Sequence, residues 1–102
     1  MTRPKNYRKI GVEPMSNFFK PRGVPMRFLK QVDLSLDELE VIRLKHYEGN
    51  DMTEGAKKMK ISKSTFQRLL SSGCKKIADA LINGKAIEIH KIIDFNFPDT
   101  NN

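Results

Sequence analysis

The chain has 102 residues, of which 38% are apolar, and this supports one compact domain with a modest core rather than two domains. No segment approaches the ~18 consecutive apolar residues of a membrane span and the start lacks the apolar run of a secretory signal, so we expect a cytoplasmic protein that does not enter a membrane. The single cysteine, Cys74, excludes an intramolecular disulfide, and the net charge of +7 favours a polyanionic partner.

Almost the whole excess of positive charge lies in residues 1–30, which carry eight Lys or Arg against one acid. Residues 1–9 form a basic arm without apolar periodicity, which is either solvated or in contact with phosphates through Arg3, Lys5, Arg8 and Lys9. Residues 10–30 contain prolines at intervals that forbid a long helix, together with aromatic residues that can hold an irregular segment against the domain. Phe18 and Phe19 are expected in core or dimer packing more often than in base stacking.

The pattern predicts a first helix over residues 35–48, with Ser35 as its N-cap, acids in its first turn and Gly49 as its stop signal. Its expected packing face is apolar and consists of Leu36, Leu39 and Ile42, with Leu44 and Tyr47 as further members. Glu38, Glu40 and Glu48 are expected to face water, and their negative charge makes this helix a scaffold rather than a DNA surface.

A second helix is predicted over residues 53–59 and a third over residues 63–83, where Asn83-Gly84 ends it. Ala56 is the small residue expected where the third helix crosses the second, and the corner between the helices is closed by Met59, Ile61, Phe66 and Leu69. Lys60 stands where such a turn often has glycine, although lysine tolerates positive φ less easily. Ser62 is expected to cap the third helix by accepting from the backbone N–H of Ser64 or Thr65.

The third helix has two faces at 100° per residue. The expected core face consists of Phe66, Leu69, Leu70, Gly73, Ile77, Ala80 and Leu81, and Cys74 lies at its edge as a small buried hydrophobe. The opposite face is either simply solvated or reads DNA, with base contacts expected from Ser64, Thr65, Gln67, Arg68 and Ser71. Backbone contacts are then expected from Ser62, Lys63 and Lys75, together with the cations of the arm.

Residues 86–94 alternate apolar and polar residues and predict a short strand, followed by a disordered tail over residues 95–102. The strand is expected to pair either with the N-terminal segment of its own chain or with the same strand of a second copy. His46 and His90 are far apart in the sequence and no ligand spacing is visible, so we predict no metal and no cofactor.

From Leu34 to Leu81 the sequence resembles the fourth, promoter-reading region of bacterial sigma factors. Over residues 3–90 it is similar to a small family of uncharacterised predicted DNA-binding proteins of bacteria and archaea. The motifs that carry the similarity are Arg3-Pro4-Lys5, Phe19-Lys20-Pro21, Gly23-Val24-Pro25-Met26, residues 34–40 with Arg43-Leu44, residues 62–68 and residues 78–86. The resemblance implies a sigma-like helix-turn-helix and DNA binding. Gly11 and Val12 stand where similar proteins often have cysteine. We therefore do not expect this chain to share a metal or redox role that those cysteines have in similar proteins.

These expectations combine into a mainly α fold: a three-helix helix-turn-helix domain over residues 31–85, an irregular basic N-terminal arm and a short C-terminal strand. The expected function is sequence-specific binding of double-stranded DNA by a transcriptional regulator that acts as a homodimer. The alternatives are a protein-interaction module that binds RNA polymerase or another regulator, and RNA binding. No phosphate-cradling loop, nucleophile elbow or acid-base pair is visible, so we do not expect an enzyme.

Overall fold

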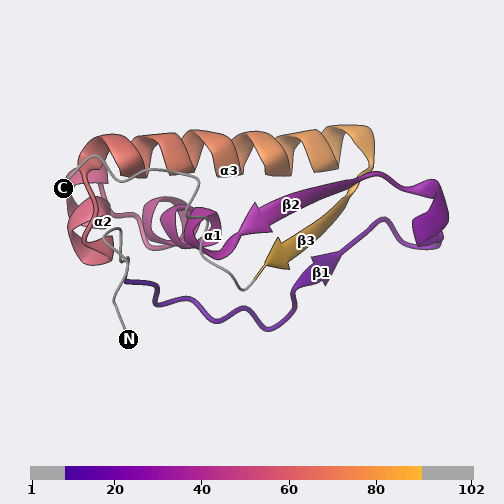
Figure 1. The fold of residues 1–102 in the computed structure, drawn as a ribbon, viewed down its shortest axis with the longest axis horizontal. Helices are drawn as coiled ribbons and strands as arrows, with labels where there is room; N and C mark the ends of the chain where they lie inside the picture. Colours follow the sequence, from indigo (N-terminus) through magenta and orange to yellow (C-terminus); the bar gives the residue numbers. More distant parts are fainter. Residues whose placement is uncertain (1–8, 91–102) are drawn as a thin grey trace, which may run out of the picture.

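The computed structural model describes residues 9–90, which form three α-helices and a small three-stranded sheet (Figure 1). The elements follow one another as β1 (Phe18–Phe19), η1 (Met26–Phe28), β2 (Gln31–Ser35), α1 (Leu36–Ile42), η2 (Arg43–Tyr47), α2 (Met52–Met59), α3 (Lys63–Asn83) and β3 (Ala86–His90). The mainly α class and the C-terminal strand are as predicted, whereas β1 and β2 were not foreseen. Figure 1 shows α3 running along the whole fold, with α2 near its start and η1 at the opposite end.

The sheet has the order β1-β3-β2, so β3 is its central strand. β3 runs antiparallel to β1, with Phe18 opposite Glu88, and parallel to β2, with Asp33 also opposite Glu88. The predicted strand therefore pairs with the N-terminal segment of its own chain, and both of its edges are hydrogen-bonded within the chain. The rest of the strand predicted to residue 94, and the tail predicted over residues 95–102, lie outside the described residues.

Local side chains explain where the helices start and stop. Ser35 and Glu38 form a capping box at the start of α1, and Asp51 caps α2 by accepting from the Glu54 N–H at 2.8 Å. The first helix continues from α1 through the π-helical turn η2 and stops before Gly49, whose φ of +80° suits glycine. Gly84 ends α3 in the left-handed conformation, as the Asn83-Gly84 pair predicted.

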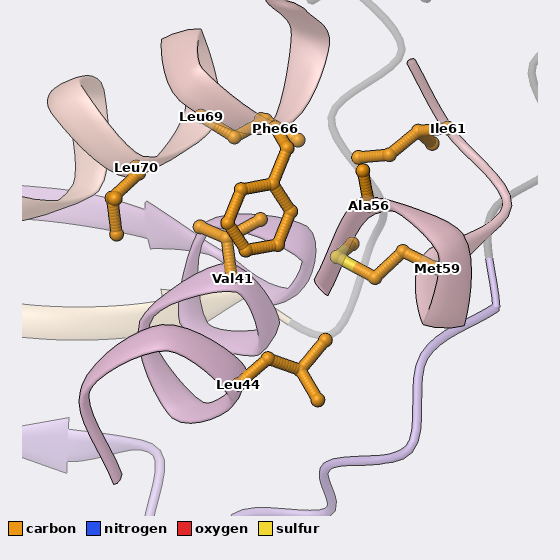
Figure 2. Packing of buried hydrophobic residues seen from close by; sticks show 8 residues of the cluster. All are labelled: Val41, Leu44, Ala56, Met59, Ile61, Phe66, Leu69 and Leu70. Carbon is orange, nitrogen blue, oxygen red and sulfur yellow. The ribbon is translucent and has the colours of Figure 1, made fainter. Parts of the chain in front are cut away.

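The core lies where α1, α2 and the first half of α3 meet. Figure 2 shows the Phe66 ring reaching from α3 to the space between Val41 of α1 and the group formed by Ala56, Met59 and Ile61. Phe66 is completely buried, and a Cβ added at Gly55 would lie 2.5 Å from its Cζ. Gly55, next to the predicted Ala56, is therefore a position in α2 where the absence of a side chain makes room for the Phe66 ring.

The expected exposure of two acids in α1 is wrong, because Glu38 is 0% and Glu40 3% exposed. Glu38 accepts from the Ser35 N–H at 2.9 Å, from the Ser72 hydroxyl and from Lys76 at 2.9 Å, which links α1 to α3. Burial acts to raise the pKa of Glu38, but these donors outweigh it and the pKa is lowered. Glu40 accepts from the Gly11 N–H at 2.9 Å and pairs with Arg43, whereas Glu48 is exposed as predicted.

Two apolar side chains also differ from their expected places. Leu81 was assigned to the core face but is 75% exposed, because it lies in the last turn of α3, where it lines a hollow at the surface with Phe19 and Lys85. Tyr47, expected to pack, is 85% exposed in η2. Cys74 is half-buried against the core, as predicted. None of the helices among residues 9–90 is long and apolar enough to cross a membrane.

Candidate nucleic-acid interface

A three-residue turn, Lys60 to Ser62, separates α2 from α3. Lys60 adopts the left-handed conformation with φ of +59°, so the two helices do not form one continuous rod. The Ile61 N–H donates to the Ala56 carbonyl at 3.0 Å, and the Ile61 side chain is buried in the core cluster. Ser62 then caps α3 by accepting from the Thr65 N–H at 3.1 Å, which is one of the two partners predicted for it.

The first turns of α3 present the polar face predicted for base contacts. Ser64, Gln67, Arg68 and Ser71 are exposed, and the Gln67 amide donates to the Ser71 hydroxyl at 3.2 Å. Thr65 is a correction, because it is 0% exposed and its hydroxyl accepts from Ser62 at 2.9 Å. Thr65 immediately precedes Phe66 in α3, so its side chain points toward the protein interior. It therefore supports the Ser62 N-cap and cannot contact a DNA base.

Cations surround this face. Lys63 and Lys75 are exposed on α3, as their predicted role requires. Lys9 is exposed beside the turn, where its N–H donates to the Met59 carbonyl at 3.0 Å and holds the chain against the end of α2. The other predicted arm contacts, Arg3, Lys5 and Arg8, lie outside the described residues.

Three further cations were not singled out from the sequence, namely Lys57, Lys58 and Lys60. All three are exposed, and they line a shallow hollow at the end of α2 together with Lys9. The signal that could have found them is the run of four lysines between residues 57 and 63. The turn and the end of α2 thus add positive charge to the side where the arm begins.

The start of α3 differs electrostatically from the starts of the other two helices. α1 and α2 carry acids in their first turn, Asp37 and Glu38 in one and Glu54 in the other, whereas α3 has none there. Its N-terminal partial charge is therefore left without a neighbouring carboxylate on the same turn and has Lys63 beside it, which favours an anion. The acid nearest to this face along α3 is Asp79, which binds Lys85 at 2.8 Å.

The sheet brings together a set of possible metal ligands that the sequence did not reveal, because they come from strands 55 residues apart. Atoms of Asp33, Glu88 and His90 lie within 4.8 Å of one another. The Gln31 amide donates to both carboxylates, and His90 lies 2.9 Å from Asp33, a contact that raises the pKa of the imidazole and lowers that of the carboxyl. These side chains hydrogen-bond to one another or to Gln31 at a partly exposed edge of the sheet, so we assign them no metal.

Together these features define a small, mainly α protein in which two helices joined by a tight turn expose a polar, cation-rich helix start. The family model described as "Protein of unknown function DUF134" matches residues 1–95, and the chain belongs to this family. It is 48% identical to a UPF0251 protein of Caldanaerobacter subterraneus and 49% identical to one of Thermoanaerobacter pseudethanolicus, over 87% of this chain and 75% of each relative. A UPF0251 protein of Dehalococcoides mccartyi is 44% identical over 87% of this chain and 76% of its own length. No solved structure matches.

Proposed function

We propose that this protein binds double-stranded DNA and regulates transcription, with α2, the turn and α3 acting as a helix-turn-helix similar to that of the fourth region of sigma factors. The observation that carries the proposal is the exposed polar face at the start of α3, opposite the buried Phe66 and Leu69. Residues 63–71 contain no acid and present two cations, a glutamine and two serine hydroxyls. A helix start of this composition fits the major groove, where phosphates and base edges are both in reach.

The residue types suggest how the contacts divide. Gln67 can pair bidentately with adenine and Arg68 with guanine, while Ser64 and Ser71 have hydroxyls suited to either base edges or phosphates. The backbone contacts fall to Ser62, Lys63, Lys75 and the arm, to which the exposed Lys57, Lys58 and Lys60 are added. The hydrogen bond from the Lys9 N–H to the Met59 carbonyl supports the backbone contacts assigned to the arm, because it holds Lys9 beside the turn.

A single module of this size makes few contacts, so the proposal includes a homodimer. Two-fold dimers double the contacts and read half-sites about 34 Å apart, which is one turn of the duplex.

The decisive experiment is selection of bound fragments from random duplex DNA at a stated salt concentration, followed by binding titrations with the recovered sequence. Arg68→Ala should weaken binding by about 1–3 kcal/mol and relax the preference at one base pair. Arg22→Ala is the matched control, because Arg22 is an exposed arginine in the segment between β1 and η1. Equal binding by wild type and Arg68→Ala would refute the assigned base contact.

Neutralising Arg3, Lys5, Arg8 and Lys9 together should act differently from the α3 variant. Binding to all sequences should weaken, and the dependence of log K on log salt should become shallower by about 1 for each lost phosphate contact. A module that binds RNA polymerase predicts little affinity for any duplex, and an RNA-binding protein predicts that RNA competes better than duplex. Either result would replace the proposal.

A further inference from the structure

Two adjoining hollows lie at the end of the molecule opposite α2, where α3 ends near η1 (Figure 1). We call them the distal hollows: Phe19, Lys20 and Leu81 line the first, Phe28 and Lys30 line the second, and Lys85 lines both. Phe28 is 69% and Leu81 75% exposed, so apolar surface in each hollow is accessible to a ligand. Exposed apolar side chains that gather at one place, with polar groups around them, are typical of an interaction surface.

The distal hollows carry positive charge that the described residues do not neutralise. Residues 14–32 contain four cations and no acid, and no described carboxylate lines either hollow. Lys20 donates to the Val24 carbonyl at 2.7 Å and Lys30 is exposed, and neither is paired with a carboxylate of residues 9–90. The hollows therefore combine apolar walls with two cations that have no acidic partner in this part of the chain.

The end of α3 does not cancel this charge. The carbonyl end of a helix carries a partial charge of about −0.5, and Lys85 is already matched to Asp79 at 2.8 Å. Lys20 and Lys30 together outweigh that partial charge, and the Arg27 guanidinium, 4.7 Å from the centre of the Phe28 ring, adds another cation beside the second hollow. A ligand of these hollows gains from negative charge as well as from apolar groups.

We propose that the distal hollows bind an acidic segment of a partner protein, in which apolar side chains stand between carboxylates. The apolar side chains fill the hollows, and the carboxylates pair with Lys20 and Lys30. The inference goes beyond the proposed function and does not depend on it. A rise of 1.5 Å per residue places the end of α3 about 30 Å from Lys63 at its start, so the two surfaces are separate.

The charges argue against a second copy of this chain as the occupant, because Lys20 and Lys30 of one copy would meet the same cations of the other. The lining of the first hollow argues against a nucleic acid. Five of its residues are apolar, and its only polar side chains are two lysines, which donate hydrogen bonds but accept none. A nucleobase seated there would leave its amino group without a side-chain acceptor, whereas leucine or phenylalanine needs none.

The test is a titration of a short fluorescein-labelled peptide with the full chain, followed by fluorescence anisotropy at about 0.1 M salt. In this probe a central leucine and phenylalanine are flanked on both sides by glutamates. One control peptide has glutamines in place of the glutamates, and another has serines in place of the apolar pair. We expect the probe to bind at least about tenfold more tightly than either control, because binding needs both the charge and the apolar groups.

Variants of the chain locate the binding. Phe28→Ser should weaken probe binding about tenfold and Lys30→Gln about threefold, and because both side chains are exposed the far-UV circular dichroism should not change. Tyr47→Ser and Lys63→Gln are the matched controls. They remove an exposed aromatic residue and an exposed lysine away from the hollows, and probe binding should stay at the wild-type level.

Three results would overturn the inference. The first is equal binding of the probe and either control peptide, or of the wild type and Phe28→Ser. The second is a single-stranded oligothymidylate that binds more tightly than the probe and is weakened by Phe28→Ser, which would assign the hollows to nucleic acid. The third is probe binding that becomes at least about tenfold tighter in the double variant Phe95→Ser, Phe97→Ser, which would assign the hollows to the segment that follows β3 in the same chain. None of these results bears on duplex binding by α3, which the fragment selection tests separately.

Discussion

Replacing Gly55 by alanine sets two effects of opposite sign against each other. In an exposed helix interior this change stabilises a protein by about 1 kcal/mol, because alanine has the higher helix propensity. At Gly55 the added Cβ would lie 2.5 Å from Phe66 Cζ and 2.7 Å from Cε2, well inside the contact distance of about 3.5 Å for carbon atoms. Phe66 is completely buried, so its ring cannot move into solvent. Overpacking costs about 1–3 kcal/mol, and the upper end applies because two ring atoms overlap; the free energy of unfolding should fall by about 2 kcal/mol.

Urea unfolding followed by circular dichroism measures this change, which corresponds to a melting temperature lower by about 10 °C. Gly73→Ala is the matched control in α3, because the nearest atom to its added Cβ is the mobile end of Ile42 at 2.9 Å, and we expect a smaller loss. Combining Gly55→Ala with Phe66→Leu should recover part of the loss, with a coupling of about 1 kcal/mol or more. A Gly55→Ala protein as stable as the wild type would mean that the ring does not pack against this face of α2.

Three further predictions concern the turn and the buried acid. Lys60→Gly should stabilise the protein by about 1 kcal/mol, because Lys60 has a φ of +59°, and a loss in urea unfolding would show that its side chain contributes more than the backbone conformation costs. Ser62→Ala should cost about 1 kcal/mol through the lost cap, while Ser64→Ala, an exposed serine two residues on, should cost much less; equal losses would contradict the cap. Burial opposes the charged form of Glu38, but Ser35, Ser72 and Lys76 outweigh it, and a pKa lowered from 4.5 means that its contribution to stability is present above pH 4.5 and is lost as the pH falls through the folded-state pKa. The stability deficit of Glu38→Gln should therefore shrink when urea unfolding is measured at about pH 3 instead of about pH 7, and a constant deficit would refute the lowered pKa.

The helical part of the fold could be predicted because its signals are local. The Ser62 cap, the Asn83-Gly84 stop and the spacing of Phe66 and Leu69 all lie within a few residues of the feature that they determine. The sheet depends instead on contacts between Gln31–Ser35 and Ala86–His90, which only the folded chain brings together. β2 has only five residues and α1 follows it directly. Its alternating pattern is therefore too short to be distinguished from the start of the helix by periodicity.

At the candidate interface, too, the features set by local sequence could be predicted and those set by the folded surroundings could not. The exposure of Gln67 and Arg68 follows from the helical period, because the apolar residues on either side of them define the core face. The burial of Thr65 was missed because the period alone does not show how far the core extends around the start of α3. The burial of Glu38 was missed for a related reason, since its partners Ser72 and Lys76 lie more than thirty residues later.

These buried acids also change how the net charge should be interpreted. By sequence, residues 31–60 carry five cations against seven acids and so appear as an acidic stretch between two basic ones. In the structure Asp37, Glu38 and Glu40 are buried, and Glu38 and Glu40 are matched to cations of the same chain, while Lys57, Lys58 and Lys60 of that stretch remain exposed beside the turn. The side that carries the start of α3 is therefore more basic than the count by segment suggests, which supports a polyanionic partner there. The salt dependence of duplex binding tests this distribution directly, because Lys57→Gln, Lys58→Gln and Lys60→Gln together should make the slope shallower by up to about 3, against up to about 4 for the four neutralised cations of the arm.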